Sequence, residues 1–149
     1  MAPDASFQKS EEIMPTTAKL LKMLESSPSR FRERLVDKND PVFHEYLDMM
    51  MKKQNLSASS LITGACISKT YAYQFINGER LPGRDIILRI GFFMKLKLDE
   101  VQRLLTLASK SVLYPKIRRD AAIMYCIKKK LTLDETNSFL EDLGEDPLL

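Results

Sequence analysis

Apolar residues recur at three- and four-residue spacing along most of this chain, and that helical period limits its fold more than any other feature. Only five glycines are present among the 149 residues. No β-hairpin turn signal stands between alternating apolar and polar residues. The sequence therefore predicts an all-α fold. With 44% hydrophobic residues, the chain is large enough for one compact soluble domain or for a small domain with an appendage.

Start and stop signals for five helices lie between residues 41 and 110. Asp40 and Pro41 suit the start of the first helix, and Ser57 and Ser68 are typical N-caps for the second and third. Asn and Gly after the third helix tolerate the left-handed backbone that ends a helix. The helices expected here cover residues 41–54, 58–64, 69–76, 83–94 and 99–109.

Helical segments are also expected on both sides of this five-helix domain. An N-terminal arm is expected to include short helices near residues 17–25 and 30–38. A C-terminal helical hairpin is expected after the domain, because Pro115 opens one helix and Thr132 and Glu135 form the capping box of the next. The expected divisions of the chain are therefore 1–40, 41–110 and 111–149.

Several classes of protein are disfavoured by what the sequence lacks. No run of eighteen apolar residues and no secretory leader is present, so we expect no membrane span and a cytoplasmic protein. Cys66 and Cys126 lack metal-ligand spacing, and we expect them to be reduced and buried, with no metal or other cofactor. The only histidine is His44, and we expect it to be exposed. No nucleophile and acid are spaced to form a catalytic triad with it, so we expect that the protein is not an enzyme.

The net charge of +3 hides a strong segregation of charge along the chain. Residues 1–65 hold nine basic and nine acidic side chains, residues 66–130 hold fourteen and five, and residues 131–149 hold none and six. A basic middle before an acidic tail favours a polyanionic partner, although a solvated helix face gives the same pattern.

A second basic group opens the C-terminal hairpin. Lys116, Arg118 and Arg119 stand at the expected start of a helix, where cations oppose the helix dipole. They either extend a DNA footprint or pair with the acids of the last helix, and we favour internal pairing slightly.

Residues 56–82 are the most informative segment of the sequence. They contain a Ser-capped short helix, a tight turn, a second Ser-capped helix and a closing Asn-Gly-x-Arg-x-Pro motif. This segment resembles the helix-turn-helix of the XRE-type, phage lambda repressor-like family, and the resemblance covers about residues 43–107. It implies a five-helix DNA-binding domain. The family has Gly in the turn where Cys66 stands, and because a left-handed backbone would strain a cysteine, we expect an altered turn.

The resemblance to this family extends over almost the whole chain. Segments 16–21, 71–80 and 113–121 are similar to a group of Firmicute XRE-like proteins of largely uncharacterised role. That similarity implies a bacterial transcription regulator that binds double-stranded DNA, and repressor-like domains usually act as homodimers on two half-sites. The alternative is a protein-binding adaptor or antitoxin-like module on the same fold. Five residues are expected to supply apolar contacts, either to a dimer or to the core: Val112, Leu113, Phe139, Leu140 and Leu143.

The resemblance places base reading on the helix Lys69–Ile76, whose N-terminal part would enter the major groove. Lys69 can donate to guanine O6 and N7, and Gln74 can pair with adenine N6 and N7. For Thr70 and Gln74 the alternative is plain solvated surface, whereas Ala72, Phe75 and Ile76 are expected in the core. The expected base-reading residues are Lys69, Thr70, Tyr73 and Gln74.

Phosphate contacts are expected to supply most of the affinity for DNA. Tyr71 is expected either to contact the sugar-phosphate backbone through its hydroxyl or to pack across the helix surface. The positions that the resemblance assigns to phosphate binding are Ser57, Ser59, Tyr71, Asn77, Arg80 and Arg84.

Overall fold

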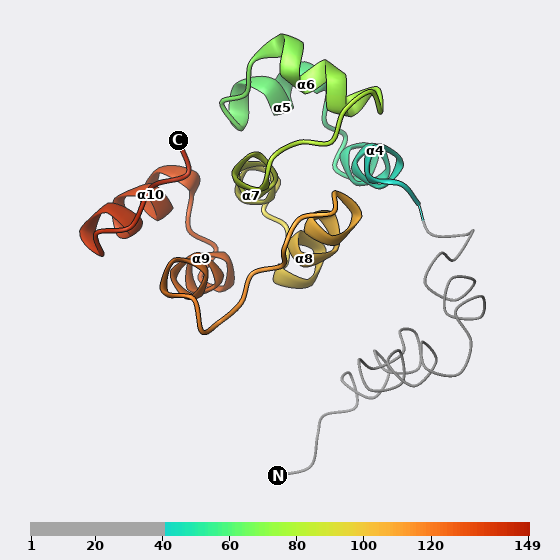
Figure 1. Cartoon of the computed structure of the whole chain (residues 1–149). Helices are drawn as coiled ribbons and strands as arrows, with labels where there is room; N and C mark the ends of the chain where they lie inside the picture. Colours follow the sequence, from blue (N-terminus) through green and yellow to red (C-terminus); the bar gives the residue numbers. More distant parts are fainter. Residues whose placement is uncertain (1–40) are drawn as a thin grey trace, which may run out of the picture. The chain divides into compact units, whose positions relative to one another are not determined.

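The computed structural model describes residues 41–149, which form one compact unit (Figure 1). The helices expected at 17–25 and 30–38 lie outside the described residues. Within 41–149 the fold is entirely helical and contains no strand, so the all-α prediction is confirmed for this part of the chain. The helices are α4 (Phe43–Lys53), α5 (Ala58–Gly64), α6 (Lys69–Ile76), α7 (Arg84–Phe93), α8 (Leu98–Leu107), α9 (Arg118–Lys128) and α10 (Leu133–Asp142).

Three of the expected N-caps are confirmed. The side-chain oxygens of Ser57, Ser68 and Thr132 each accept a hydrogen bond from the backbone N–H three residues later, at 3.1–3.3 Å. Each bond satisfies one of the free N–H groups that begin a helix, which is why α5, α6 and α10 start where the sequence indicates.

The expected start of α9 at Pro115 is wrong, because the helix begins at Arg118. A turn precedes it, closed by a hydrogen bond from the Ile117 N–H to the Tyr114 carbonyl at 3.1 Å. The Asp120 carboxylate accepts the N–H of Tyr114 at 3.0 Å. This side chain reaches back out of α9 and holds the chain around Pro115 in a non-helical path.

Each of the seven described helices is followed, two residues after its last residue, by a residue with left-handed backbone. In each case the following N–H donates to the carbonyl five residues earlier, which is the Schellman arrangement. Cys66 is one of these residues, with φ of 56°. The altered turn expected between α5 and α6 is therefore wrong, and the turn keeps its ordinary shape with a cysteine in a strained conformation. The left-handed residues are Asn55, Cys66, Gly78, Lys95, Ser109, Lys130 and Gly144.

Helices α4 to α8 pack around a shared apolar core. Phe43 and Leu47 of α4, Phe75 of α6 and Leu104 of α8 are all at most 2% exposed. The rings of Phe43 and Phe75 meet edge to face with centroids 6.4 Å apart. Helix α5 lies so close to α7 that a Cβ atom on Gly64 would meet the Phe93 ring. A larger residue at that position would force the Phe93 ring to move, so α5 and α7 are in close contact there.

Helices α7–α8 and α9–α10 form two hairpins that match in sequence thirty-five positions apart. Residues 84–85 and 119–120 both read Arg-Asp, and residues 95–100 and 130–135 both read Lys-Leu-x-Leu-Asp-Glu. The contacts between the hairpins are also equivalent: the first helix of each hairpin contacts the second helix of the other, α7 with α10 and α9 with α8. The C-terminal hairpin is thus a second copy of the one before it, packed against the first.

Reciprocal ion pairs join the two hairpins at the start of α7 and α9. Arg84 pairs with Asp120 at 2.8 Å, and Arg119 pairs with Asp85 at 3.1 Å. Each Arg-Asp pair of residues therefore binds the equivalent pair of the other hairpin. An exchange of this kind is typical of two copies related by a two-fold rotation.

Equivalent amides also hold the segment that follows each hairpin. The Gln102 side-chain oxygen accepts the N–H of Leu113 at 2.7 Å, and the Asn137 side-chain oxygen accepts the N–H of Leu148 at 2.7 Å. Leu113 and Leu148 are both buried, at 2% and 0% exposure. The chain after α10 is consequently anchored in the core in the same way as the chain after α8.

Two expectations about single residues are wrong. Cys66 is exposed because it lies in the turn between α5 and α6, whereas Cys126 is buried as expected. His44 is half-buried and lies against Gly78, where an added Cβ would stand 2.7 Å from its ring. Among residues 41–149 no three His, Cys, Asp or Glu side chains gather as a metal site requires. No helix in that range has the length and hydropathy needed to cross a membrane.

Candidate nucleic-acid interface

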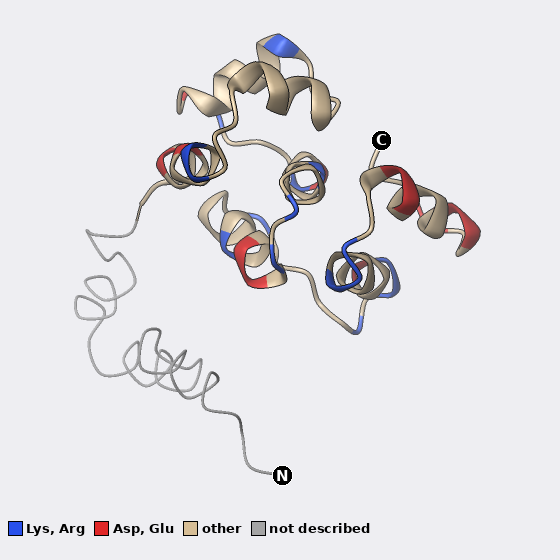
Figure 2. Cartoon of the chain, turned by 180° about the vertical axis from the view of Figure 1, so that it is seen from behind, with Lys and Arg blue, Asp and Glu red and all other residues tan. Residues whose placement is uncertain are grey.

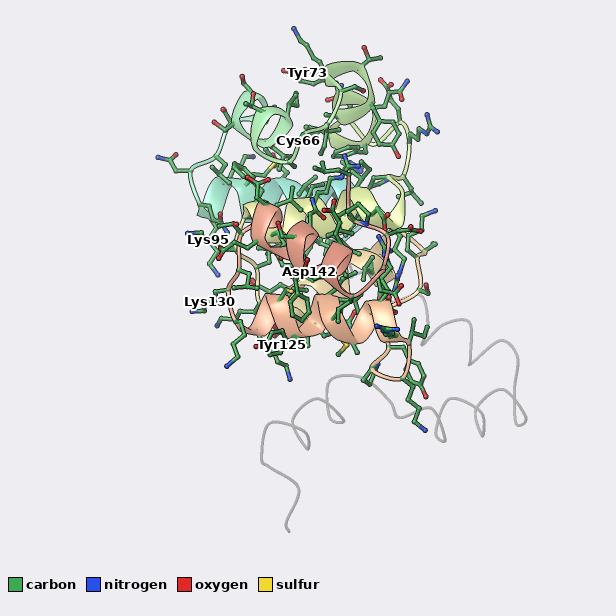
Figure 3. All side chains as sticks on the ribbon, turned by 90° about the vertical axis from the view of Figure 1, so that its left-hand side faces the viewer. Cys66, Tyr73, Lys95, Tyr125, Lys130 and Asp142 are labelled. Atoms are coloured by element: carbon green, nitrogen blue, oxygen red, sulfur yellow. The ribbon has the colours of Figure 1, made fainter. Side chains whose placement is uncertain are left out.

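Helix α6 presents a polar face at its N-terminal end. Lys69, Thr70 and Tyr73 are exposed on this helix, whereas Ala72 and Phe75 are buried at 0% and 1%. Tyr73 lies at the opposite end of the molecule from Tyr125 of α9 (Figure 3). The expected separation of α6 into a core side and an outward side is confirmed.

The remaining polar candidates lie beside this face with different degrees of exposure. Gln74 is half-buried, and Asn77 is exposed at the end of α6. Ser59 is exposed in the first turn of α5. The Ser57 hydroxyl caps α5 and also donates to the Ser60 hydroxyl at 3.0 Å, so its proton has an internal acceptor. The structure thus gives Ser57 a capping role and leaves Ser59 and Asn77 open to solvent.

Tyr71 packs inside the molecule, which was one of its two expected roles. Its hydroxyl accepts the N–H of Gly83 at 2.9 Å, and its ring meets Phe75 edge to face with centroids 5.7 Å apart. The guanidinium of Arg80 stands over the same ring at 5.0 Å from the centroid. Tyr71 therefore ties the segment after α6 to the helix and holds the exposed Arg80 beside the polar face.

Arg84, one of the residues expected to bind phosphate, makes four hydrogen bonds within the molecule. Its guanidinium donates two hydrogen bonds to the Asp120 carboxylate at 3.0 and 2.8 Å. It also donates to the backbone carbonyls of Ser111 and Val112 at 2.9 and 3.1 Å. Because these acceptors engage all three guanidinium nitrogens, Arg84 joins α7 to α9.

The partner of Arg84 is a buried acid that sequence patterns did not single out. Asp120 is 2% exposed. Burial alone would raise the pKa of Asp120, but hydrogen bonds from Arg84 and from the Tyr114 N–H, with the charges of Arg84 and Arg119, outweigh it. The pKa of Asp120 is therefore lowered and the carboxylate stays charged. The repeated Arg-Asp dipeptide was the sequence signal for this pairing.

The other arginines of the C-terminal basic group also bind within the molecule. Arg118 donates to the Leu143 carbonyl at 2.9 Å and lies 3.7 Å from the Glu145 carboxylate. Arg119 binds Asp85 and donates to the Asp146 carbonyl at 2.9 Å. The favoured alternative, pairing with the C-terminal acids, is confirmed for Arg118, which pairs with Glu145. For Arg119 it is wrong, because the carboxylate that this arginine binds is Asp85 of α7. Lys116 is exposed in the turn before α9.

Most of the residues expected to supply apolar contacts belong to the core. Leu113 and Leu140 are buried, and Phe139 and Leu143 are partly buried against them. Val112 is 44% exposed, and Tyr114 and Ile117 nearby are 49% and 52% exposed. We call these three exposed residues the 112–117 patch; Val112 was expected to make apolar contacts, whereas Tyr114 and Ile117 were not singled out from the sequence.

Charge is sparse around α6 and concentrated elsewhere (Figure 2). Between residues 58 and 83 the charged side chains are Lys69, Glu79 and Arg80. Acids gather on α10 and basic residues on α9 (Figure 2). Positive charge at the candidate interface therefore rests on Lys69 and Arg80.

Residues 41–149 therefore form an all-helical unit that includes a duplicated helical hairpin. In this unit, α6 presents a polar and weakly basic face. Comparisons with family models, curated proteins and solved structures found no match to this chain.

Proposed function

We propose that this protein is a sequence-specific double-stranded DNA-binding transcription regulator that reads the major groove with α6. The observation that carries the proposal is the exposed face of α6, where Lys69, Thr70 and Tyr73 project while Ala72 and Phe75 anchor the helix. Helix α5 precedes α6 through the short connection 65–68, which supports a helix-turn-helix arrangement within a five-helix, repressor-like domain.

The side chains of α6 have the chemistry to read bases. Lys69 donates to guanine O6 or N7, and Gln74 offers both a donor and an acceptor to adenine. Thr70 binds a base or a phosphate, and the exposed Tyr73 packs against or donates to the groove wall. We assign base reading to these four residues.

Phosphate binding falls to fewer residues than the sequence suggested. Arg80, Asn77 and Ser59 are exposed beside α6 and are the phosphate contacts in this proposal. Tyr71 acts by holding Arg80, and Arg84 is committed to Asp120. With two cations per chain at the interface, the slope of log K against log salt is expected to be about −2 for a monomer and about −4 for a dimer.

A selection from random duplex DNA, followed by binding measurements on the enriched sequence, tests this proposal. Lys69→Ala is expected to weaken binding to the enriched sequence by about 1–3 kcal/mol and to weaken binding to random duplex much less. Lys53→Ala removes an exposed lysine from the last turn of α4 and serves as the matched control. Enrichment of no motif at low salt, or equal losses for both variants, would contradict base reading by α6.

A protein-binding role is the second candidate, and the 112–117 patch favours it. Val112, Tyr114 and Ile117 expose apolar surface within six residues, whereas a monomer usually shows such residues singly. The patch would serve an adaptor or antitoxin-like partner, or a second copy of the chain in a homodimer on DNA. Ile117→Lys is expected to reduce the mass measured by light scattering if the patch is a dimer contact, and an unchanged dimer mass would exclude it.

A further inference from the structure

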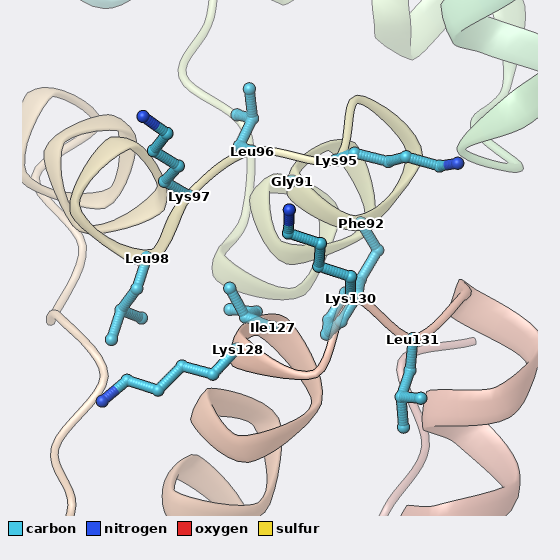
Figure 4. Close-up of a pocket in the computed structure, with 10 residues that line it drawn as sticks. All are labelled: Gly91, Phe92, Lys95, Leu96, Lys97, Leu98, Ile127, Lys128, Lys130 and Leu131. Carbon is cyan, nitrogen blue, oxygen red and sulfur yellow. The ribbon is translucent and has the colours of Figure 1, made fainter.

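A pocket of about 300 Å³ lies between the two helical hairpins, at the C-terminal ends of α7 and α9 (Figure 4). Its walls are mostly apolar and come from equivalent parts of the two repeats. Phe92 and Leu96 belong to the first hairpin, and Ile127 and Leu131 are their counterparts thirty-five positions later in the second. A volume of this size falls at the lower end of the range for small-molecule pockets, which is roughly 300–1,000 Å³.

Four lysines line the same pocket. Lys95 and Lys97 come from the connection between α7 and α8, and Lys128 and Lys130 come from the end of α9. In Figure 4 the Lys130 side chain crosses the centre of the view, with Lys97 and Lys128 to one side and Lys95 to the other. All four residues are exposed, and no acidic residue lines the pocket.

Two glutamates that follow these lysines in the sequence are engaged with backbone N–H groups. Glu100 accepts the backbone N–H of Lys97 at 2.9 Å. Glu135 accepts the backbone N–H of Thr132 at 3.0 Å as part of the capping box that begins α10. Within residues 41–149, the lysine that forms an ion pair is Lys52 on α4. The pocket therefore combines apolar walls with four ammonium groups that have no carboxylate partner in the described structure.

Helix dipoles account for three of the four lysines but not for Lys97. Cations near the ends of α7 and α9 suit the negative ends of these helices, which covers Lys95, Lys128 and Lys130. Lys97 is the N-cap residue of α8, where a cation opposes the dipole. Each connection also brings the negative end of one helix close to the positive start of the next, so the two helix dipoles partly offset each other there.

We propose that this pocket binds a small amphipathic anion, with an apolar body between the hairpins and a carboxylate or phosphate head among the lysines. The apolar walls favour a hydrocarbon or aromatic body by excluding it from water. An ammonium group is a compact point charge that accepts either head group. The pocket is lined by residues of α7, α8, α9 and the segments next to them and includes no residue of α6. This proposal therefore does not depend on the proposed binding of DNA.

Titration of the full-length protein with octanoate, followed by calorimetry and by amide chemical shifts, tests the proposal. Octanoate is expected to bind and to shift the amides of Gly91, Leu96 and Leu131. Octanol has the same body without the charge, and acetate and inorganic phosphate have the charge without the body. All three are expected to bind at least about fivefold more weakly. Octyl phosphate shows which head group the lysines prefer.

A double variant, Lys97→Gln with Lys130→Gln, removes two of the four charges from exposed positions. It is expected to weaken octanoate binding about five- to tenfold, since each exposed contact contributes up to about 1 kcal/mol. Lys53→Gln with Lys116→Gln removes two exposed lysines that do not line the pocket and is expected to leave binding unchanged.

Three results would overturn the proposal. The first is the absence of octanoate binding, and the second is equal binding of octanol or acetate. The third is an equal loss of affinity in both double variants, because that would indicate a general effect of net charge.

Discussion

The buried ion pair between Arg84 and Asp120 predicts that the two equivalent aspartates of the duplicated hairpin differ sharply in their effect on stability. Asp120 accepts two hydrogen bonds from Arg84 and one from the Tyr114 N–H, and its side chain is 3% exposed. Asp85, its counterpart, binds Arg119 with a side chain that is 45% exposed. Asp120→Asn and Asp85→Asn make the same chemical change at both sites.

The expected cost follows from burial. Removing one partner of a buried ion pair costs about 3–5 kcal/mol, because the remaining charge loses its compensation. Arg84 is 23% exposed and partly screened by solvent, so we expect about 3 kcal/mol for Asp120→Asn. Asp85→Asn is expected to cost about 0.5–1 kcal/mol, because the Asp85 carboxylate is half exposed and screened by solvent, and Arg119 keeps its hydrogen bonds to the Asp146 and Pro147 carbonyls.

Urea unfolding followed by circular dichroism measures both values, with equal slopes required for a valid comparison. A destabilisation of Asp120→Asn below about 1 kcal/mol, or one equal to that of Asp85→Asn, would refute the argument from burial. Such a result would also return Arg84 to the set of side chains free to bind a phosphate.

Two further predictions concern acid stability and the turn at Cys66. The pKa of Asp120 is lowered in the folded protein, so its contribution to stability is complete above the ordinary Asp pKa of about 4 and is lost as pH falls through the lowered pKa. Urea unfolding below about pH 4 should show a smaller fall in stability for Asp120→Asn than for the unaltered protein, and parallel curves would contradict this. Cys66→Gly should raise the free energy of unfolding by about 0.5–1 kcal/mol because glycine relieves the left-handed strain. Cys66→Val should lower the free energy of unfolding by about 1 kcal/mol. Thermal or urea unfolding measures both changes. If the two variants shift the free energy of unfolding in the same direction, the argument from left-handed strain is wrong.

Local sequence signals located most of the helices correctly. Ser57, Ser68 and Thr132 mark helix starts because their side chains bond to N–H groups only three residues away. The start of α9 was misplaced because Asp120 is engaged with Arg84 and Tyr114. That interaction involves α7, which lies more than thirty residues earlier in the chain.

The candidate interface was predictable in part. Exposure of Lys69, Thr70 and Tyr73 follows from helical period, since Ala72 and Phe75 occupy the buried side. Arg84 and Arg80 look alike in the sequence, and both stand near Pro82. Only the structure distinguishes them, because Arg84 meets a buried carboxylate and Arg80 meets an aromatic ring at the surface.

The sequence by itself determined the helical class, most helix boundaries and the division of α6 into buried and exposed sides, because these depend on hydrogen bonds and periodicities within a few residues. Tertiary structure decided which charges are paired. It placed Asp120 against Arg84, and it gathered Lys95, Lys97, Lys128 and Lys130 around one apolar pocket. Ion pairing depends on which groups lie close together in space, not on their separation along the chain. The packing of one hairpin against the other therefore determines which basic residues form internal ion pairs and which remain exposed without one.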